Sequence, residues 1–192
     1  NLMPLLALLL AREGVPVLIQ GRHDFDSRAN PFDLLAALDL PLAASPATAS
    51  AALVAQRIAC IDVEHLLPGL ARLLALRPRM GVRTTAHTLA KLIDPCPGHS
   101  VRVVAVTHPE YLQRMGEFLR ADHGPSMLLR GTEGEAYAIP RRLPQLTLFD
   151  HGTARIGGEA AEGGAPPRDD FPDAPEVAAN AELIRAMLDG QL

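Results

Sequence analysis

Tryptophan is absent from this 192-residue chain, and aromatic residues make up only 4% of it. Aromatic platforms on which single-stranded bases could stack are therefore scarce. The chain has only two cysteines, Cys60 and Cys96, which excludes a disulfide scaffold and predicts a reducing, cytoplasmic location. Lysine is almost missing too, since Lys91 stands alone beside 17 arginines.

No long hydrophobic run is present. Residues 2–11 are nearly all apolar, but ten residues are too few to cross a bilayer, which takes ~20. The run also lacks the cationic start and the cleavage site of a signal peptide. We therefore expect a buried helix over 4–12 and no membrane partner, and the abrupt apolar start suggests that upstream protein is missing.

The composition is that of a folded chain, with 48% hydrophobic and 21% charged residues, which excludes a mostly disordered protein. The patterning predicts strands alternating with helices, and hence an α/β fold with a largely parallel sheet flanked by helices. The expected strands are 15–20, 57–61, 101–106, 126–130 and 146–149. The expected helices are 32–38, 63–77, 83–93, 109–121 and 176–188, with irregular chain over 40–50 and loop over 151–174.

Positive charge is concentrated in one segment, although the net charge is −4. Residues 151–192 carry 3 Lys+Arg against 8 Asp+Glu, whereas residues 72–102 carry six cations against Asp94 alone. An arginine guanidinium can donate two parallel hydrogen bonds to one phosphate, which a lysine ammonium cannot do. A GC-rich genome would explain the preference for arginine, but it does not explain the clustering.

Within this segment Arg83, His87 and Lys91 follow one another at i, i+4 and i+8, with Arg77 and Arg79 just upstream. On a helix this spacing predicts one cationic stripe, which can hold phosphates independently of base sequence. A solvated helix face, or a helix packed against an acidic surface, is the alternative.

Polar residues follow three expected strands, at 20–22, 107–109 and 130–133. Ligands of open α/β sheets bind beyond the carboxyl ends of strands, so these ends would form one crevice if their strands were neighbours. The alternative is that they are plain turns, with Thr107 capping a helix. Glu133 and Glu135 flank Gly134 and could bind Mg²⁺, or could form a solvated acidic loop. Cys96 and His99 lack the second ligand pair of a zinc site.

The segment RMGVRTTAHTLAKLIDP at 79–95, followed by VRVVAVTHPEYLQRMGEFL at 101–119, resembles the anthranilate phosphoribosyltransferase family, or glycosyltransferase family 3. The resemblance covers roughly residues 1–150. It implies a large α/β subdomain like that of phosphoribosyltransferases and nucleoside phosphorylases, formed by 1–78 and 98–150. Residues 79–97 would belong to a small helical subdomain that dimerises, and residues 151–192 would form an acidic loop and a closing helix. The family's glycine-rich pyrophosphate loop would lie upstream of residue 1.

The chain departs from the family pattern at several site positions. Of the family's Lys-His-Gly-Asn motif only the glycine is kept, as Gly21 within Ile-Gln-Gly-Arg. When this sequence is aligned with the family pattern on Gly134, Ala136 and Tyr137 stand where the family has an Asp-Glu pair that binds Mg²⁺. The family's Asn and Gly-Pro become His87, Ala90 and Lys91, whereas Arg83 matches the arginine that contacts the aromatic acid.

Because metal ions neutralise the pyrophosphate that leaves in phosphoribosyl transfer, these losses predict a protein with no catalytic residues and no cofactor. The chain resembles most a divergent bacterial branch of the family, which is known to bind nucleic acid without evident transferase activity. The resemblance therefore implies a homodimer that binds single-stranded DNA or RNA, independently of sequence, through a basic groove. The expected contacts are Arg77, Arg79, Arg83, His87, Lys91, Arg130, Arg141 and Arg142. The alternative is an active transferase that uses phosphoribosyl pyrophosphate and an altered acceptor, with Mg²⁺ on Glu133 or Glu135.

Overall fold

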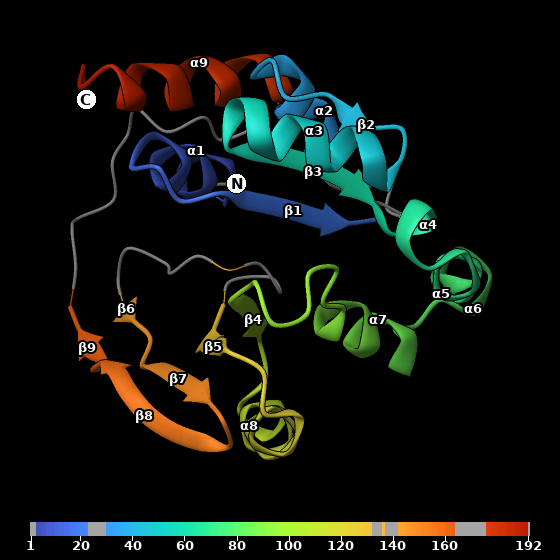
Figure 1. Cartoon of the computed structure of the whole chain (residues 1–192), viewed down its shortest axis with the longest axis vertical. Coiled ribbons are helices and arrows are strands. Elements are labelled where there is room, and N and C mark those ends of the chain that lie inside the picture. Colours follow the sequence, from blue (N-terminus) through green and yellow to red (C-terminus); the bar gives the residue numbers. More distant parts are fainter. Residues whose placement is uncertain (1–2, 23–29, 132–135, 137–141, 164–175, 192) are drawn as a thin grey trace. The chain divides into compact units, whose positions relative to one another are not determined.

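The computed structural model describes residues 3–22, 30–131, 136, 142–163 and 176–191, and they form two compact units (Figure 1). The first unit consists of Asn1–Ala90 together with Asp169–Leu192, and the second consists of Lys91–Arg168. The second unit is thus an insertion in the sequence of the first.

The first unit is built around a three-stranded parallel sheet in the order β1-β3-β2. Its strands are β1 (Val17–Gly21), β2 (Leu42–Ala43) and β3 (Ile58–Asp62). Its helices are α1 (Met3–Arg12), α2 (Pro31–Ala37), α3 (Pro46–Gln56), α4 (Val63–Leu66), α5 (Pro68–Leu74), α6 (Arg77–Met80), α7 (Thr85–Leu89) and α9 (Val177–Leu188). The central strand β3 is almost fully buried, as expected for a parallel strand covered on both faces.

Alternate residues of β3 point into two different cores. Ile58 and Cys60 pack with Phe32 and Leu35 of α2 and with Ala7 of α1. Ala59 and Ile61 face the other way and pack against α3. A third layer lies outside α2, where Leu34 and Leu38 pack against Ala181 and Ile184 of α9. The sequence is therefore folded into helix–helix–sheet–helix layers within this unit.

The second unit contains a four-stranded mixed sheet in the order β4-β5-β7-β8. Its elements are β4 (Arg102–Val106), α8 (Pro109–Asp122), β5 (Ser126–Arg130), β6 (Arg142–Leu143), β7 (Leu146–Asp150), β8 (Thr153–Gly158) and β9 (Ala161–Glu162), preceded by the 3-10 turn Ala90–Leu92. Strands β4 and β5 are parallel, β7 and β8 continue the sheet antiparallel, and β6 pairs with β9.

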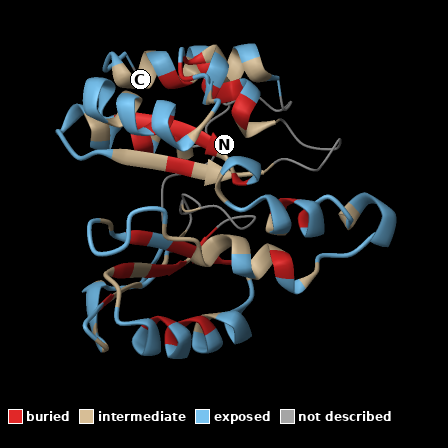
Figure 2. Cartoon of the chain, turned by 45° about the vertical axis from the view of Figure 1, so that its right-hand side comes forward, coloured by how far each residue is buried: buried red, intermediate tan, exposed pale blue. Residues whose placement is uncertain are grey.

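Helix α8 covers one face of this sheet. Its buried side carries Met115 and Leu119, which pack against Val104, Leu128 and Phe149. Figure 2 shows buried residues along one side of the helix and exposed ones along the other. The β4–α8–β5 succession is the parallel crossover expected from the sequence.

Four expectations about local structure need correction. Residues 40–50 are not irregular, because Ser45 accepts a hydrogen bond from the amide of Thr48 at 3.2 Å and begins α3. The expected helix 63–77 is interrupted at Leu67, because Pro68 has no N–H to continue it. Pro78 lies in the first turn of α6 and does not end a helix. Residues 151–174 include β8 and β9, where a loop was expected.

Among the described residues, every helix is too short or too polar to cross a membrane.

Candidate functional site

The carboxyl ends of β4 and β5 meet in the second unit, as the parallel pairing requires. The Arg130 Nε donates to the Thr107 carbonyl at 3.2 Å, and the Gly131 amide donates to the Val106 carbonyl at 3.0 Å. The N-cap of α8 is His108, so Thr107 is not the helix cap that the alternative required. Two of the three expected strand ends therefore converge on one edge of the sheet.

The third strand end, after β1, belongs to the first unit. There Arg22 Nη1 lies 3.4 Å from the Asp62 Oδ1 and 3.1 Å from the Glu64 Oε2. Asp62 also caps α4, since its Oδ1 accepts from the Glu64 amide at 2.7 Å. The cation at this strand end is thus balanced by two carboxylates of the neighbouring strand and helix.

The arginine segment, residues 72–83, spans the end of α5, all of α6 and the turn before α7. Arg72, Arg79 and Arg83 are exposed, whereas Arg77 is half-buried. The segment also exposes apolar side chains: Leu73 by 52%, Met80 by 52% and Val82 by 58%. Arginines are therefore interleaved with accessible apolar side chains on this part of the first unit.

The cationic stripe predicted along a single helix 83–93 is wrong, because regular helix is confined to α7. Arg83 precedes the N-cap residue Thr84, and Lys91 lies in the 3-10 turn that follows α7. His87 caps the helix instead, since its Nδ1 accepts from the Thr84 amide at 3.1 Å. The 3.6-residue spacing that would align these side chains holds only between 85 and 89.

Lys91 makes a structural contact in the second unit. Its Nζ donates to the carbonyl of Ala105, a residue of β4, at 2.5 Å. Leu92 and Asp94 are held nearby by Arg102, which donates to the Leu92 carbonyl at 3.2 Å. The chain between α7 and β4 is therefore tied to β4 at successive points.

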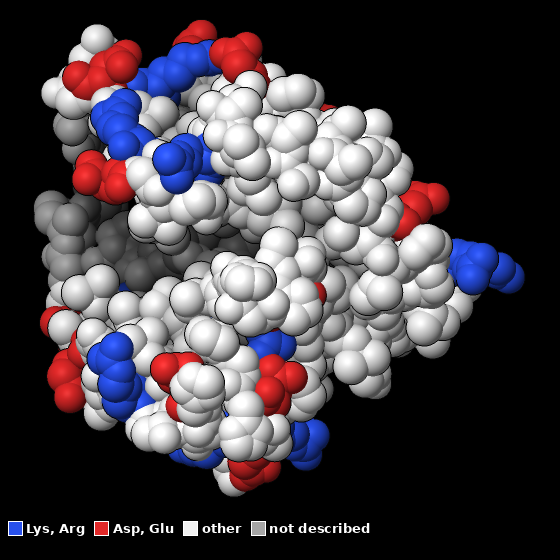
Figure 3. Space-filling view, viewed as in Figure 1, with Lys and Arg blue, Asp and Glu red and all other residues white. Residues whose placement is uncertain are grey.

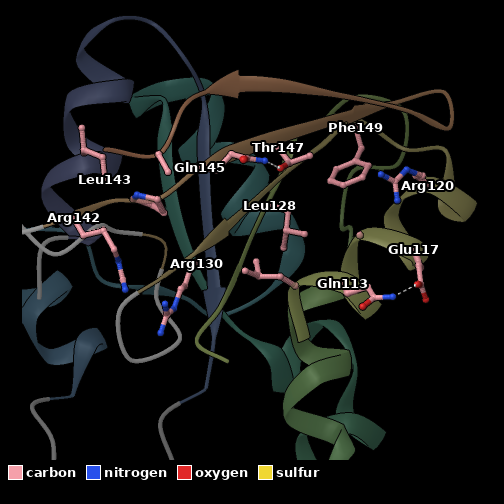
Figure 4. Close-up of a pocket in the computed structure, with 14 residues that line it drawn as sticks. Gln113, Glu117, Arg120, Leu128, Arg130, Arg142, Leu143, Gln145, Thr147 and Phe149 are labelled. Atoms are coloured by element: carbon pink, nitrogen blue, oxygen red, sulfur yellow. Dashed lines mark hydrogen bonds between the residues drawn. The ribbon is translucent and has the colours of Figure 1, made fainter. Parts of the chain in front are cut away.

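A pocket of about 630 Å³ opens between α8 and the strands β5 and β7 (Figure 4). Arg120, Arg130 and Arg142 line it together with one carboxylate, Glu117. Figure 4 shows the Arg130 and Arg142 side chains extending in the same direction, whereas Arg120 lies beside the ring of Phe149. The guanidinium carbon of Arg120 is 5.6 Å from the centre of that ring.

Sequence reasoning selected Arg130 and Arg142 but missed the rest of this pocket. Gln113, Glu117 and Arg120 recur on one side of α8, a helical spacing that the sequence does contain. Gln145 and Thr147 come from the strand that returns antiparallel, and no motif marks them. The pocket depends on a pairing of β5 with β7 that was not predicted.

Three of the selected residues, Glu133, Glu135 and Arg141, lie outside the described residues. In the part of the chain that is described, no three His, Cys, Asp or Glu side chains are grouped as metal ligands. Figure 3 shows, on the face it presents, small groups of Lys and Arg interrupted by Asp and Glu in each unit. Burial raises the pKa of the Cys60 thiol to about 11, so this cysteine stays protonated and unreactive at neutral pH.

Comparisons with known proteins place the fold. No protein-family model matches the chain. It is 38% identical over 157 residues to the uncharacterized protein YbiB of Escherichia coli, covering 81% of this chain and 49% of YbiB. It is 29% identical over 199 residues to the anthranilate phosphoribosyltransferase of Thermus thermophilus, covering 100% of this chain and 57% of the enzyme.

A crystal structure of the Thermus thermophilus enzyme matches with a TM-score of 0.76 and 27% identity, again over 100% of this chain and 57% of that one. The chain therefore spans about half the length of the curated relatives it matches. The α/β architecture expected from the sequence is confirmed.

Proposed function

Since the chain belongs to the anthranilate phosphoribosyltransferase-like family, we propose that it is a divergent member that binds single-stranded DNA or RNA and does not transfer phosphoribosyl groups. Binding is directed to the sugar–phosphate backbone and is independent of base sequence. The intact protein acts as a cytoplasmic homodimer with no membrane partner.

The observation that carries this proposal is the exposed arginine segment. No Asp or Glu occurs between Glu64 and Asp94, so the positive charge of this stretch is not balanced by its own sequence. Arg79 and Arg83 are exposed on either side of the turn between α6 and α7. Planar guanidinium groups there suit phosphate oxygens, and the adjacent apolar side chains Met80 and Val82 suit the faces of unpaired bases.

The second unit supplies further cations of the same kind. Arg130 and Arg142 line its pocket, and Arg141 precedes Arg142 in the sequence. His87 caps α7 through the Thr84 amide in the first unit, and Lys91 is bound to the Ala105 carbonyl in the second.

The strand end after β1 argues against phosphoribosyl transfer. Family enzymes have Lys-His-Gly-Asn there, whereas this chain has Arg22 held by Asp62 and Glu64. Because the charge of Arg22 is already balanced by these two carboxylates, it offers a pyrophosphate less positive charge than the lysine and histidine of the family motif. Ala136 stands where alignment on Gly134 puts a metal-binding carboxylate, and a methyl group cannot ligate Mg²⁺.

The proposal is tested by titrating the chain into a fluorescently labelled single-stranded oligonucleotide and following anisotropy at several salt concentrations. Affinity should fall steeply as salt rises, because counterions released from the phosphates drive binding. The double variant Arg79→Ala/Arg83→Ala should bind more weakly, with a salt slope smaller by about 1.4, or about 0.7 for each lost phosphate contact.

The matched control is Arg114→Ala/Arg155→Ala, which removes two exposed arginines elsewhere and the same total charge. If both double variants lose affinity equally, the segment is not the binding surface. Absence of oligonucleotide binding, together with Mg²⁺-dependent binding of phosphoribosyl pyrophosphate, would favour the transferase alternative. Glu133 and Glu135 would then be the first residues to substitute.

A further inference from the structure

The pocket of the second unit combines two kinds of surface. Its inner wall is apolar, formed by Leu112 of α8, Leu128 of β5 and Phe149 of β7. Arg130 and Arg142 lie on its other side. At about 630 Å³ it falls within the range of small-molecule sites.

The lining arginines differ in how they are held. Arg120 rests against the Phe149 ring, and the nearby Glu117 accepts a hydrogen bond from the Gln113 amide at 3.0 Å. Arg130 donates from its Nε to the Thr107 carbonyl at 3.2 Å, which restrains the guanidinium and leaves the N–H groups of its two Nη atoms as further donors. A restrained guanidinium loses less conformational entropy when it binds an anion than a freely rotating one.

Arg142 adds a second guanidinium on the same side as Arg130 (Figure 4). It lies opposite Glu162 in the β6–β9 ladder, but no ion pair within 4.0 Å joins these two described side chains. The described lining of the pocket therefore carries three cations against the single carboxylate of Glu117. This excess favours a ligand with a compact negative group.

Hydrogen-bonding groups of mixed character complete the lining. Gln145 Nε2 donates to Thr147 Oγ1 at 3.2 Å, which leaves the amide oxygen of Gln145 as an acceptor and the Thr147 hydroxyl hydrogen as a donor. Amide and hydroxyl groups can satisfy the edges of different bases. Such a lining accommodates a flat polar ring without selecting one base.

We propose that this pocket holds one nucleotide, with its phosphate on Arg130 and Arg142 and its base against the apolar wall at Leu128. The inference deepens the nucleic-acid function proposed above, because it names the place where one unit of a bound strand is seated. It accounts for binding by a chain with few aromatic residues, since the base lies against the apolar wall of Leu112, Leu128 and Phe149 and does not stack on an exposed ring.

The test measures binding of adenosine 5′-monophosphate to the full chain by isothermal titration calorimetry, with adenosine and inorganic phosphate as part-ligands. Saturable binding of the nucleotide, with each part-ligand at least about tenfold weaker, is the expected result. Arg142→Ala should weaken nucleotide binding by about tenfold or more, because it removes a charge-assisted contact with the phosphate.

A steric variant provides an independent check. Ala160 is an exposed pocket residue between β8 and β9, so Ala160→Phe fills the pocket without touching the core. It should abolish nucleotide binding. The charge control is Arg155→Ala, which removes the same charge as Arg142→Ala but lies on β8 outside the pocket, and it should leave nucleotide binding unchanged. Circular dichroism and the melting temperature confirm that each variant folds.

The two proposals fail in different ways. Nucleotide binding that is absent at millimolar concentration, or is equal in Arg142→Ala, Ala160→Phe and the parent chain, overturns the pocket assignment. If oligonucleotide affinity still depends on Arg79 and Arg83, the proposed function survives that result. Pocket-dependent nucleotide binding without any oligonucleotide binding would instead leave the pocket standing and overturn the proposed function.

Discussion

The guanidinium of Arg102, at the start of β4, donates to the carboxylate of Asp122, at the end of α8. The same guanidinium donates to the Leu92 carbonyl and lies 3.9 Å from the Asp94 carboxylate. Arg102 is only 8% exposed, so these partners compensate for the burial of its charge. One side chain thus joins the entry to the second unit, its first strand and its main helix.

Replacing Arg102 with methionine should destabilise the second unit. The substitution keeps the volume but leaves the Asp94 and Asp122 carboxylates without their cation. Because both carboxylates retain some contact with water, we expect a loss of about 2–3 kcal/mol, at or below the low end for a broken buried ion pair. Urea unfolding followed by circular dichroism measures this change.

The companion variant Asp122→Asn keeps a hydrogen-bond acceptor for Arg102 and should cost less. A double-mutant cycle then gives the coupling between the two side chains. A coupling near zero would show that Asp122 contributes little to the effect of Arg102, and would leave that effect to the contacts with Leu92 and Asp94.

The cap of α3 should contribute measurably to the stability of the first unit. Ser45 accepts from the Thr48 amide, and Thr48 Oγ1 accepts from the Ser45 amide at 2.9 Å. Ser45→Ala removes one half of this reciprocal pair and should cost about 1 kcal/mol. Thermal unfolding of Ser45→Ala measures this loss. Ser45→Asp is the control, because an aspartate carboxylate can accept the same hydrogen bond and should recover most of the lost stability.

Two glycines of the second unit should respond oppositely to alanine. A Cβ on Gly157 of β8 would lie 2.6 Å from Leu148 Cδ1, so Gly157→Ala forces Leu148 to move and should cost about 1–2 kcal/mol. A Cβ on Gly116 of α8 would meet Phe149 at 3.6 Å, an ordinary contact. Gly116→Ala should therefore stabilise the helix by about 0.5–1 kcal/mol, and chemical denaturation of both variants checks the opposite signs.

The two cysteines should differ in reactivity and in their effect on alkaline stability. Cys96 is exposed, whereas burial raises the pKa of the Cys60 thiol to about 11. A thiol reagent at pH 8 should modify one cysteine in the native chain and both after unfolding. Peptide mapping by mass spectrometry identifies the modified residue.

Because native Cys60 keeps a proton that the unfolded chain releases, its contribution to stability is lost as pH rises from about 9 towards 11. Cys96→Ser should leave this alkaline decline unchanged, whereas Cys60→Ala should reduce it. Equal pH profiles for the parent and Cys60→Ala would contradict the prediction.

Sequence patterns predicted strands well where burial and turn residues agreed. The strand β5 was placed at its observed bounds, because Gly-Pro precedes it and Gly131 follows it. Helix α3 was missed because its Ala, Ser and Pro composition is shared by loops, and its cap needs Ser45 and Thr48 to be judged as a pair. The strands β8 and β9 were missed because the many glycines and charged residues of this segment are typical of loops, although the chain there forms antiparallel strands.

The candidate site was predictable only in part, for a geometric reason. Arg130 follows a clearly marked strand, so its position at a strand end could be read from the sequence. The prediction that Arg83, His87 and Lys91 share one helix face was wrong, because it assumed an unbroken helix over 83–93, whereas α7 covers only Thr85–Leu89. Pairing between β5 and β7 also depends on contacts that no local pattern encodes.

The last helix, α9, packs against α2, and Arg12 of α1 donates to its Leu188 carbonyl at 2.8 Å. Residues near the two ends of the sequence must therefore meet before the first unit is complete. During synthesis on a ribosome, residues 91–168 emerge as a contiguous block while α9 is still to be made. The inserted unit can thus reach its native packing while Leu34 and Leu38 of the surrounding unit still lack their contacts with Ala181 and Ile184.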